Sequence, residues 1–285
     1  MHQFFGDLNA FDFFNNIALY VTIISSIFFV KAKTQAMGLY SKYVLFYVSK
    51  KGLRAKKILE YFLAFIEMFI LMAISLISAF FNAPLGNLLN TGVNYFGNLF
   101  SIAPLVFIFS LIIMANPMKQ MDIVTLLLPI RLFFVKLACY CQGCCWGISW
   151  KYGPYNHHYD HPGNQVPVQA IEAFWAIAIL FFLLVYRKKA KTGTLFPIYM
   201  ILYSGTRFFS EFFRNEENVL WIFKTYHLLC LVGIAIGLIM LLIVKIFGEK
   251  ITEHFENSHR KLDLKIAQHE EQKGMRTHLI SKGKA

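Results

Sequence analysis

The sequence predicts an all-α, polytopic membrane protein with about seven transmembrane helices. Of the 285 residues, 57% are hydrophobic and only 15% are charged, and the mean hydropathy is +0.51, unlike an ordinary soluble domain. Several apolar stretches also approach the roughly 20 residues that a helix needs to cross about 30 Å of hydrocarbon. Helices satisfy their own backbone polar groups, so they can span a bilayer without water.

Apolar stretches follow one another along most of the chain. They cover residues 11–30, 59–82, 98–115, 122–140, 167–186, 194–213 and 227–247. We interpret residues 1–247 as one transmembrane bundle, whose first span is permanent because it has no basic leader region or small-residue cleavage site. Residues 248–285 are polar and mixed in charge, so we expect a basic cytoplasmic tail, helical or disordered, that lies on anionic lipid head groups.

Basic residues are concentrated in alternate loops. One set of loops contains Lys31, Lys33, Lys42, Lys50, Lys51, Arg54, Lys56, Lys57, Lys119, Arg187, Lys188, Lys189 and Lys191, and the basic tail follows on the same side. The opposite loops contain only Lys151, Arg214 and Lys224 as basic residues. The positive-inside rule therefore predicts an outside N-terminus and a cytoplasmic C-terminus in the cell inner membrane. We interpret the net charge of +12 as the basic residues that set the orientation of the chain in the membrane, not as a nucleic-acid-binding surface.

A few ionisable side chains fall within the predicted spans. They are Arg131, Lys136, Arg207, Glu67, Glu172 and Glu211. Such groups cost several kcal/mol in a bilayer unless they face a polar interior, so we treat them as functional candidates, with ion pairing between helices as the alternative. Glu172 lies one turn inside its span, where it can meet Arg207, Lys136 or a substrate hydroxyl.

The sixth span carries a polar stripe. Tyr203, Arg207, Glu211 and Arg214 are spaced by four, four and three residues, which predicts one continuous helix face. One interpretation is a string of intrahelical ion pairs. The other is an anion clamp, because a guanidinium stays charged and its planar fork of donors matches phosphate. At this depth, the anion would be a phospholipid head group.

Four of the five cysteines lie within seven residues at the end of the fourth span. They are Cys139, Cys141, Cys144 and Cys145. Close packing, a disulfide, thiol chemistry and metal binding are all open, but the second pair of a zinc ribbon is absent, so we do not expect a metal site. In the following loop, His157, His158 and His161 beside an aspartate suggest a metal site. Because the adjacent His157 and His158 point in different directions, we interpret these histidines instead as titrating external residues.

Three motifs resemble the prolipoprotein diacylglyceryl transferase family. The segment from Lys136 to Gly147 resembles its Arg-x-Gly-Asn-Phe-x-Asn-Gly-Glu-x-x-Gly signature. Pro167, Gln169 and Glu172 resemble its His-Pro-x-Gln-x-x-Glu box. The stripe from Tyr203 to Arg214 matches its Tyr-x-x-x-Arg-x-x-x-Glu-x-x-Arg helix in residue type and spacing. The resemblance covers residues 94–243, and seven spans with an outside N-terminus agree with it.

The chain departs from the family pattern at several motif positions. Lys136 stands for the signature arginine and Gln142 for its second asparagine, and two cysteines replace its first asparagine and its glutamate, at Cys139 and Cys144. Val166 replaces the histidine of the His-Pro box. Spacing back from Lys136 places Phe96 where the family has a histidine in an outer loop. The usual proton acceptor is therefore missing from its usual place.

The resemblance implies transfer of a diacylglyceryl group from phosphatidylglycerol to the thiol of a lipobox cysteine in a prolipoprotein signal peptide, with release of glycerol phosphate. It implies no cofactor, and the partners are these two substrates and the surrounding membrane lipids. The expected catalytic residues are Arg207 and Lys136 as phosphate clamps, Tyr203 as a donor and Glu172 as an orienting group or proton acceptor. The expected substrate-binding residues are Gln142, Gly143, Cys139, Gln169, Glu211 and Arg214. The general base is open among Glu172, His157 and water.

Two other functions are compatible with the same residues. A divergent homologue could use the phospholipid site for another acceptor or for cysteine-based chemistry, which the substituted signature suggests. A non-enzymatic protein could bind or transport lipid through its buried charges. Against transport, the sequence shows no inverted repeat and no matching pair of broken helices.

Overall fold

The computed structural model describes residues 37–49, 53–78, 95–156, 162–215 and 223–282, together with the isolated positions 17, 20 and 21. Its helices are α3 (Leu39–Ser49), α4 (Leu53–Ser78), α6 (Tyr95–Ile112), α7 (Pro117–Gln142), α8 (Val168–Tyr186), α9 (Leu195–Glu211) and α10 (Thr225–Lys282). Two short antiparallel strands, β1 (Tyr155–Asn156) and β2 (Gly163–Asn164), lie in the loop between α7 and α8. The predicted all-helical architecture is confirmed, apart from this small hairpin.

Four of the described helices are long and apolar enough to cross a membrane. They are α6, α7, α8 and the part of α10 from Thr225 to Lys265. These helices overlap the predicted spans 98–115, 122–140, 167–186 and 227–247. The predicted span 194–213 corresponds to α9, which has 17 residues. The predicted span 11–30 lies outside the described residues except for positions 17, 20 and 21.

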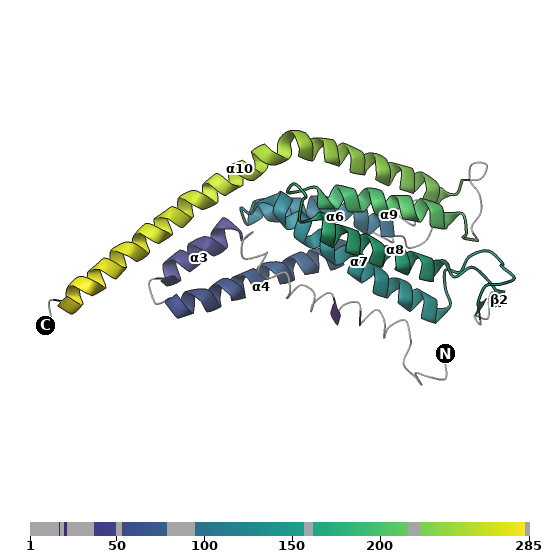
Figure 1. The fold of residues 1–285 in the computed structure, drawn as a ribbon, viewed down its shortest axis with the longest axis horizontal. Helices are drawn as coiled ribbons and strands as arrows, with labels where there is room; N and C mark the ends of the chain where they lie inside the picture. The colour runs from purple at the N-terminus through teal and green to yellow at the C-terminus, as the bar shows by residue number, and fades with distance from the viewer. Residues whose placement is uncertain are drawn as a thin grey trace.

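The helices form one bundle around an apolar core (Figure 1). Within it, α10 packs on α9, α8 lies between α7 and α9, and α6 contacts both α4 and α7. The core takes residues from six of the described helices, for example Leu71, Ile102, Leu128, Ile179, Phe196 and Cys230. Many large apolar side chains face outward instead, which suits contact with lipid better than contact with water.

Helix α7 has clear start and stop signals. The side chain of Asn116 accepts hydrogen bonds from the backbone N–H groups of Met118 and Lys119, and Pro117 occupies the first turn, where no N–H is needed. At the other end, Gly143 has φ 80°, a left-handed conformation that glycine adopts without strain. The chain therefore leaves α7 abruptly at Gly143, and the cysteine-rich segment folds back against the helix end.

Asp122 fastens the start of α9 to α7. Its Oδ2 accepts a hydrogen bond from the N–H of Gly193 at 2.7 Å, and its Oδ1 accepts one from the N–H of Leu195 at 3.1 Å. The first N–H groups of a helix have no partner within the helix, so this carboxylate acts as a cap supplied by another helix. It sets the position of α9, which carries Tyr203 and Arg207.

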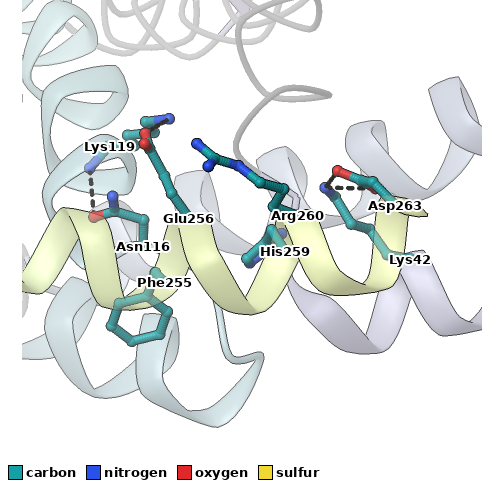
Figure 2. Close-up of a pocket in the computed structure, with 8 residues that line it drawn as sticks. All are labelled: Lys42, Asn116, Lys119, Phe255, Glu256, His259, Arg260 and Asp263. Carbon is teal, nitrogen blue, oxygen red and sulfur yellow. Dashed lines mark hydrogen bonds and ion pairs between the residues drawn. The ribbon is translucent and has the colours of Figure 1, made fainter. Parts of the chain in front are cut away.

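Helix α10 continues without a break from its apolar half into the predicted tail. The polar half is held to other elements by three ion pairs: Lys191 to Glu249 at 2.6 Å, Lys119 to Glu256 at 2.8 Å and Lys42 to Asp263 at 3.0 Å. A cavity of about 280 Å³ lies between this half of α10, the start of α7 and Lys42 of α3. Figure 2 shows the residues that line it. The described part of the predicted tail, up to Lys282, is thus helical.

Substitution of Asp122 by alanine should destabilise the bundle. Two partly buried N–H groups at the start of α9 would lose their acceptor, and each such loss costs about 1 to 3 kcal/mol. The measurement is the thermal unfolding temperature in detergent. Asp122→Asn is the matched control, because it keeps one acceptor oxygen and should retain part of the stability. An unchanged Tm for Asp122→Ala would contradict this role.

Candidate functional site

One end of the bundle gathers most of the residues that the sequence singled out. The C-terminal ends of α7 and α9 and the N-terminal ends of α8 and α10 meet there, beside the β1–β2 hairpin (Figure 1). Lys136 lies near the end of α7, Glu172 one turn into α8 and Arg207 one turn before the end of α9. Three separate helices therefore bring charged side chains to one place.

Glu172 is the centre of this arrangement. Its Oε1 accepts a hydrogen bond from Nη1 of Arg207, and its Oε2 pairs with Nζ of Lys136 at 2.5 Å. Nη2 of Arg207 pairs in turn with Oε2 of Glu211 at 2.9 Å. We call Lys136, Glu172, Arg207 and Glu211 the charge network. Of the partners that the sequence left open for Glu172, the structure shows Arg207 and Lys136.

The charge network is almost completely buried. The exposed fraction of the side chain is 14% for Lys136, 7% for Glu172, 6% for Arg207 and 0% for Glu211. Removing ions from water costs several kcal/mol each, so they persist only where opposite charges and hydrogen bonds compensate. Two cations and two anions balance here. The guanidinium of Arg207 also lies 4.9 Å from the ring centre of Tyr226, an attractive cation–π contact.

An aromatic wall borders the charge network on the side of α6. The rings of Tyr95 and Phe96 lie 4.9 Å and 5.6 Å from the ring of Tyr203. The hydroxyl groups of Tyr95 and Tyr199 are hydrogen-bonded to each other at 3.0 Å. Phe96 is buried and packs as an apolar ring, so it cannot accept a proton at that position.

A narrow cleft opens beside Arg207. Its lining combines polar groups of α8 and α9 with apolar side chains: Leu132, Glu172, Trp175, Ala176, Ile179, Tyr203, Thr206, Arg207 and Ser210. Its volume is about 10 Å³, roughly the room of one water molecule, so a larger amphipathic ligand enters only where these polar and apolar side chains move apart. The four expected catalytic residues are thus together: three line the cleft, and Lys136 is bonded to one of them.

The cysteine-rich segment lies against the start of α8. Nε2 of Gln169, a fully buried side chain, donates a hydrogen bond to the backbone carbonyl of Cys144. The Sγ atoms of Cys139, Cys144 and Cys145 lie within 4.8 Å of one another. Gln142, the last residue of α7, is exposed. Of the predicted substrate-binding residues, Cys139, Gly143 and Gln169 therefore share one small region of the structure.

Arg214 does not lie on the α9 face with the other three residues of its motif. Helix α9 ends at Glu211, and the chain turns so that Arg214 pairs through its backbone with Gly147. A side chain added at Gly147 would lie 2.3 Å from the carbonyl oxygen of Phe213, so only glycine allows this approach. The prediction that one helix face continues from Tyr203 to Arg214 was wrong at its last residue, because this backbone contact ends the helix.

Two residues of this end were missed by the sequence analysis. Lys224 is buried, and its Nζ donates to the carbonyl oxygens of Glu211 at 2.8 Å and Arg214 at 2.6 Å. It thereby satisfies carbonyl groups at the end of α9, as cations at helix C-termini do. Tyr226, which stacks on Arg207, is the other. Lys224 and Tyr226 could have been found from the sequence, because both come just before the predicted span 227–247, which follows the span that contains Arg207. His157, His158 and His161 lie outside the described residues.

The sequence model of the prolipoprotein diacylglyceryl transferases matches residues 17–243. The chain belongs to this family. It is 30% identical over 155 residues to the phosphatidylglycerol-prolipoprotein diacylglyceryl transferase of Chlorobaculum tepidum, which is 52% of this chain and 54% of that protein. It is 28% identical over 113 residues to the enzyme of that name in Clostridium tetani, which is 35% of this chain and 43% of that protein. The chain thus spans about half the length of the curated relatives that it matches.

The prolipoprotein diacylglyceryl transferase family is a family of membrane enzymes, and the apolar helices agree with a multi-pass membrane protein. As a member, the chain keeps the Arg207 helix and the Gln-x-x-Glu segment at Gln169 and Glu172, and these are the segments that build the charge network. Its departures lie at Lys136, which is itself part of the charge network, in the cysteine-rich segment, at Val166 and at Phe96.

Replacing Glu172 by glutamine should destabilise the protein strongly. The change keeps the shape of the side chain but leaves Lys136 and Arg207 without their shared anion, and breaking a buried ion pair costs about 3 to 5 kcal/mol. In a chain of this size, Tm should fall on the order of 10 °C. Glu249→Gln is the matched control: it breaks the exposed pair with Lys191 and should leave Tm unchanged. Equal effects of the two changes would show that the charge network is not what holds these helices together.

Proposed function

We propose that this chain transfers the diacylglyceryl group of phosphatidylglycerol to the thiol of a lipobox cysteine in an exported prolipoprotein and releases glycerol phosphate. The observation that supports this most is the convergence of Arg207 and Lys136 on Glu172 beside an amphipathic cleft. This cleft lies in a membrane bundle of the prolipoprotein diacylglyceryl transferase family.

Arg207 is the main phosphate-binding residue in this proposal. Glu172 and Glu211 each take one of its terminal nitrogens, which fixes the plane of the guanidinium. The remaining N–H groups can bind phosphate oxygens in a defined direction. Lys136 adds a second cation, and two of its three ammonium donors remain for the phosphate, since Glu172 takes one.

The two cations would act on the leaving group. When the carbon–oxygen bond to phosphate breaks, the electron pair stays on the phosphate oxygen, and negative charge develops there. Cations held in a dry site stabilise such charge more than water does, because they need no reorganisation at the moment of reaction. Tyr203, which lines the same cleft, would donate its hydroxyl to a phosphate or ester oxygen.

Loss of the guanidinium should abolish most of the activity. The purified protein is mixed with phosphatidylglycerol micelles and a lipobox peptide, and glycerol phosphate release and peptide mass are measured. Arg207→Ala should reduce the rate by about 10² to 10³, in line with removal of one electrostatic donor from a catalytic site. Arg207→Lys keeps the charge without the fork and should also be slow. Lys191→Ala removes an exposed cation beside the opposite end of α9 and should react like the wild type.

The outcomes separate the candidate functions. Diacylglyceryl addition that is lost in the Arg207 variants supports the proposed transferase. A folded wild-type protein that releases no glycerol phosphate and adds no mass would overturn it. Release of glycerol phosphate without a gain in peptide mass would also overturn it and would indicate another acceptor.

We also infer that the chain crosses the membrane seven times, with the N-terminus outside and the C-terminus in the cytoplasm of the cell. This rests on the positive-inside rule and on the ion pairs that join Lys42, Lys119 and Lys191 to the polar half of α10, which group these basic loops with the tail. The charge network lies at the opposite end of the bundle, which would face outward, where exported prolipoproteins emerge.

Fusion of a green fluorescent protein after Ala285 tests this orientation. The fusion should fluoresce, and a secreted phosphatase fused at the same place should be inactive, since it needs the oxidising outer compartment. The same two reporters inserted in the β1–β2 hairpin should give the reverse pattern. A fluorescent hairpin fusion with an active phosphatase at Ala285 would invert the proposed topology.

A further inference from the structure

Three thiol groups meet beside the charge network. The Sγ atoms of Cys139, Cys144 and Cys145 lie within 4.8 Å of one another, and no disulfide joins them. In a zinc site, the metal–sulfur distance is about 2.3 Å, which places tetrahedral sulfur ligands roughly 3.8 Å apart. The longest separation of these sulfur atoms is thus within about 1 Å of the spacing that zinc requires. We call these three residues the thiol cluster.

The backbone at the end of α7 creates the thiol cluster. The left-handed turn at Gly143 allows the N–H of Cys144 to donate to the carbonyl of Cys139 at 3.2 Å, so that residues five apart become neighbours. Cys145 has φ 63°, a conformation that is uncommon for a residue with a side chain. Such backbone conformations are held by the surrounding structure and cluster at functional sites. Here the conformation coincides with a side chain that joins a group of three potential ligands.

The neighbouring cysteine of the segment is not part of this group. Cys141 is two positions after Cys139 on α7, and residues two apart on a helix point about 200° away from each other. Cys141 therefore offers a matched comparison: the same residue type, in the same helical turn, outside the thiol cluster. The sequence could not predict which of these four cysteines come together, because that depends on the helix end at Gly143.

The thiol cluster borders the residues of the proposed reaction. Gln169 bonds the carbonyl of Cys144, and Glu172, one turn further along α8, bonds both Lys136 and Arg207. Lys136 lies one turn before Cys139 and Tyr140 on α7. Short covalent paths and direct hydrogen bonds thus connect the sulfur atoms with the proposed phosphate-binding cations.

Among the described residues, Phe96 and Val166, which replace the two histidines of the family pattern, offer no acceptor for the proton of a substrate thiol. Phe96 is apolar and buried, and Val166 uses only its backbone, accepting from Gly147 at 2.9 Å and donating to Ile148 at 3.1 Å. Both oxygens of Glu172 are already bonded to cations. A thiol must nevertheless become a thiolate before it attacks carbon. A metal ion achieves this directly, since a thiol that binds it loses its proton.

We propose that Cys139, Cys144 and Cys145 bind one zinc ion, whose fourth position takes the sulfur of the acceptor cysteine. Three protein ligands with one open position is the arrangement of catalytic zinc sites. This proposal rests on the proposed function for its role in the reaction, whereas the binding of the metal by the thiol cluster stands on the geometry alone.

In the proposed reaction, the diacylglyceryl group moves from a phosphate oxygen to the acceptor sulfur. The acceptor thiol binds zinc as a thiolate, and its proton passes to water. The sulfur attacks the diacylglyceryl carbon that carries the phosphate oxygen, so that one carbon–sulfur bond forms and one carbon–oxygen bond breaks. The electron pair of the broken bond leaves on glycerol phosphate, next to Arg207 and Lys136. The thioether product is a neutral, weaker ligand and leaves the zinc, which is neither oxidised nor reduced.

The binding experiment uses the full chain, purified under reducing conditions and freed of metal. Zinc is titrated against a competing chelator dye, and cadmium is used as a spectroscopic probe of thiolate ligation. The wild type should bind one ion per chain. Cys139→Ser, Cys144→Ser and Cys145→Ser should each weaken binding on the order of 100-fold or more, since losses outside the ligand set alone cost about 10- to 100-fold. Cys141→Ser and Cys230→Ser should bind like the wild type.

Equal binding by Cys139→Ser and Cys141→Ser would overturn the site, and so would the absence of a thiolate-to-cadmium absorption band. Activity is measured separately, with the micelle and peptide assay. Metal-free protein should lose activity and regain it with zinc. Full activity in metal-free protein would overturn the role of zinc while leaving the transferase function standing. A protein that binds zinc through the thiol cluster but never releases glycerol phosphate would retain the site and overturn the proposed function.

Discussion

The structure depends on the bonds that Glu172 makes with Arg207 and Lys136. These residues come from α8, α9 and α7, so the contact fixes three helices relative to one another inside a low-dielectric core. None of the charges would be tolerated there alone. Their mutual compensation lets two cations remain at one end of an apolar bundle, where the proposed phosphate binding needs them. Asp122 at the other end of α9 serves the same purpose, because it sets the depth at which Arg207 lies.

Much of the fold could be predicted because a membrane imposes simple requirements on sequence. Long apolar stretches predicted the helices. The rare charged residues within them identified Lys136, Glu172, Arg207 and Glu211 as candidate functional residues. The end of α9 was misplaced, because the approach of Gly147 to Phe213 and Arg214 joins segments far apart in the chain. Lys224 and Tyr226 escaped notice for a similar reason: their partners are the end of one helix and the guanidinium of another.

The cysteine-rich segment shows where spacing stops being informative. Four cysteines in seven residues allow packing, disulfides or metal binding, and only the left-handed turn at Gly143 decides which of them meet. In a family whose known signature has amide and carboxylate side chains at two of these positions, such a change alters the chemistry available next to the cleft. A shared fold can thus accommodate a different way of activating the same nucleophile.

Helix α10 has 58 residues, which corresponds to a length of about 87 Å at 1.5 Å per residue. This is nearly three times the roughly 30 Å of hydrocarbon that one span must cross. The length beyond one such span is the polar half of α10, which ion pairs attach to α3 and to the segment before α9, and dissolved salt weakens such pairs. The ionic strength of the surrounding solution thereby decides how closely this half of the helix is held to the bundle.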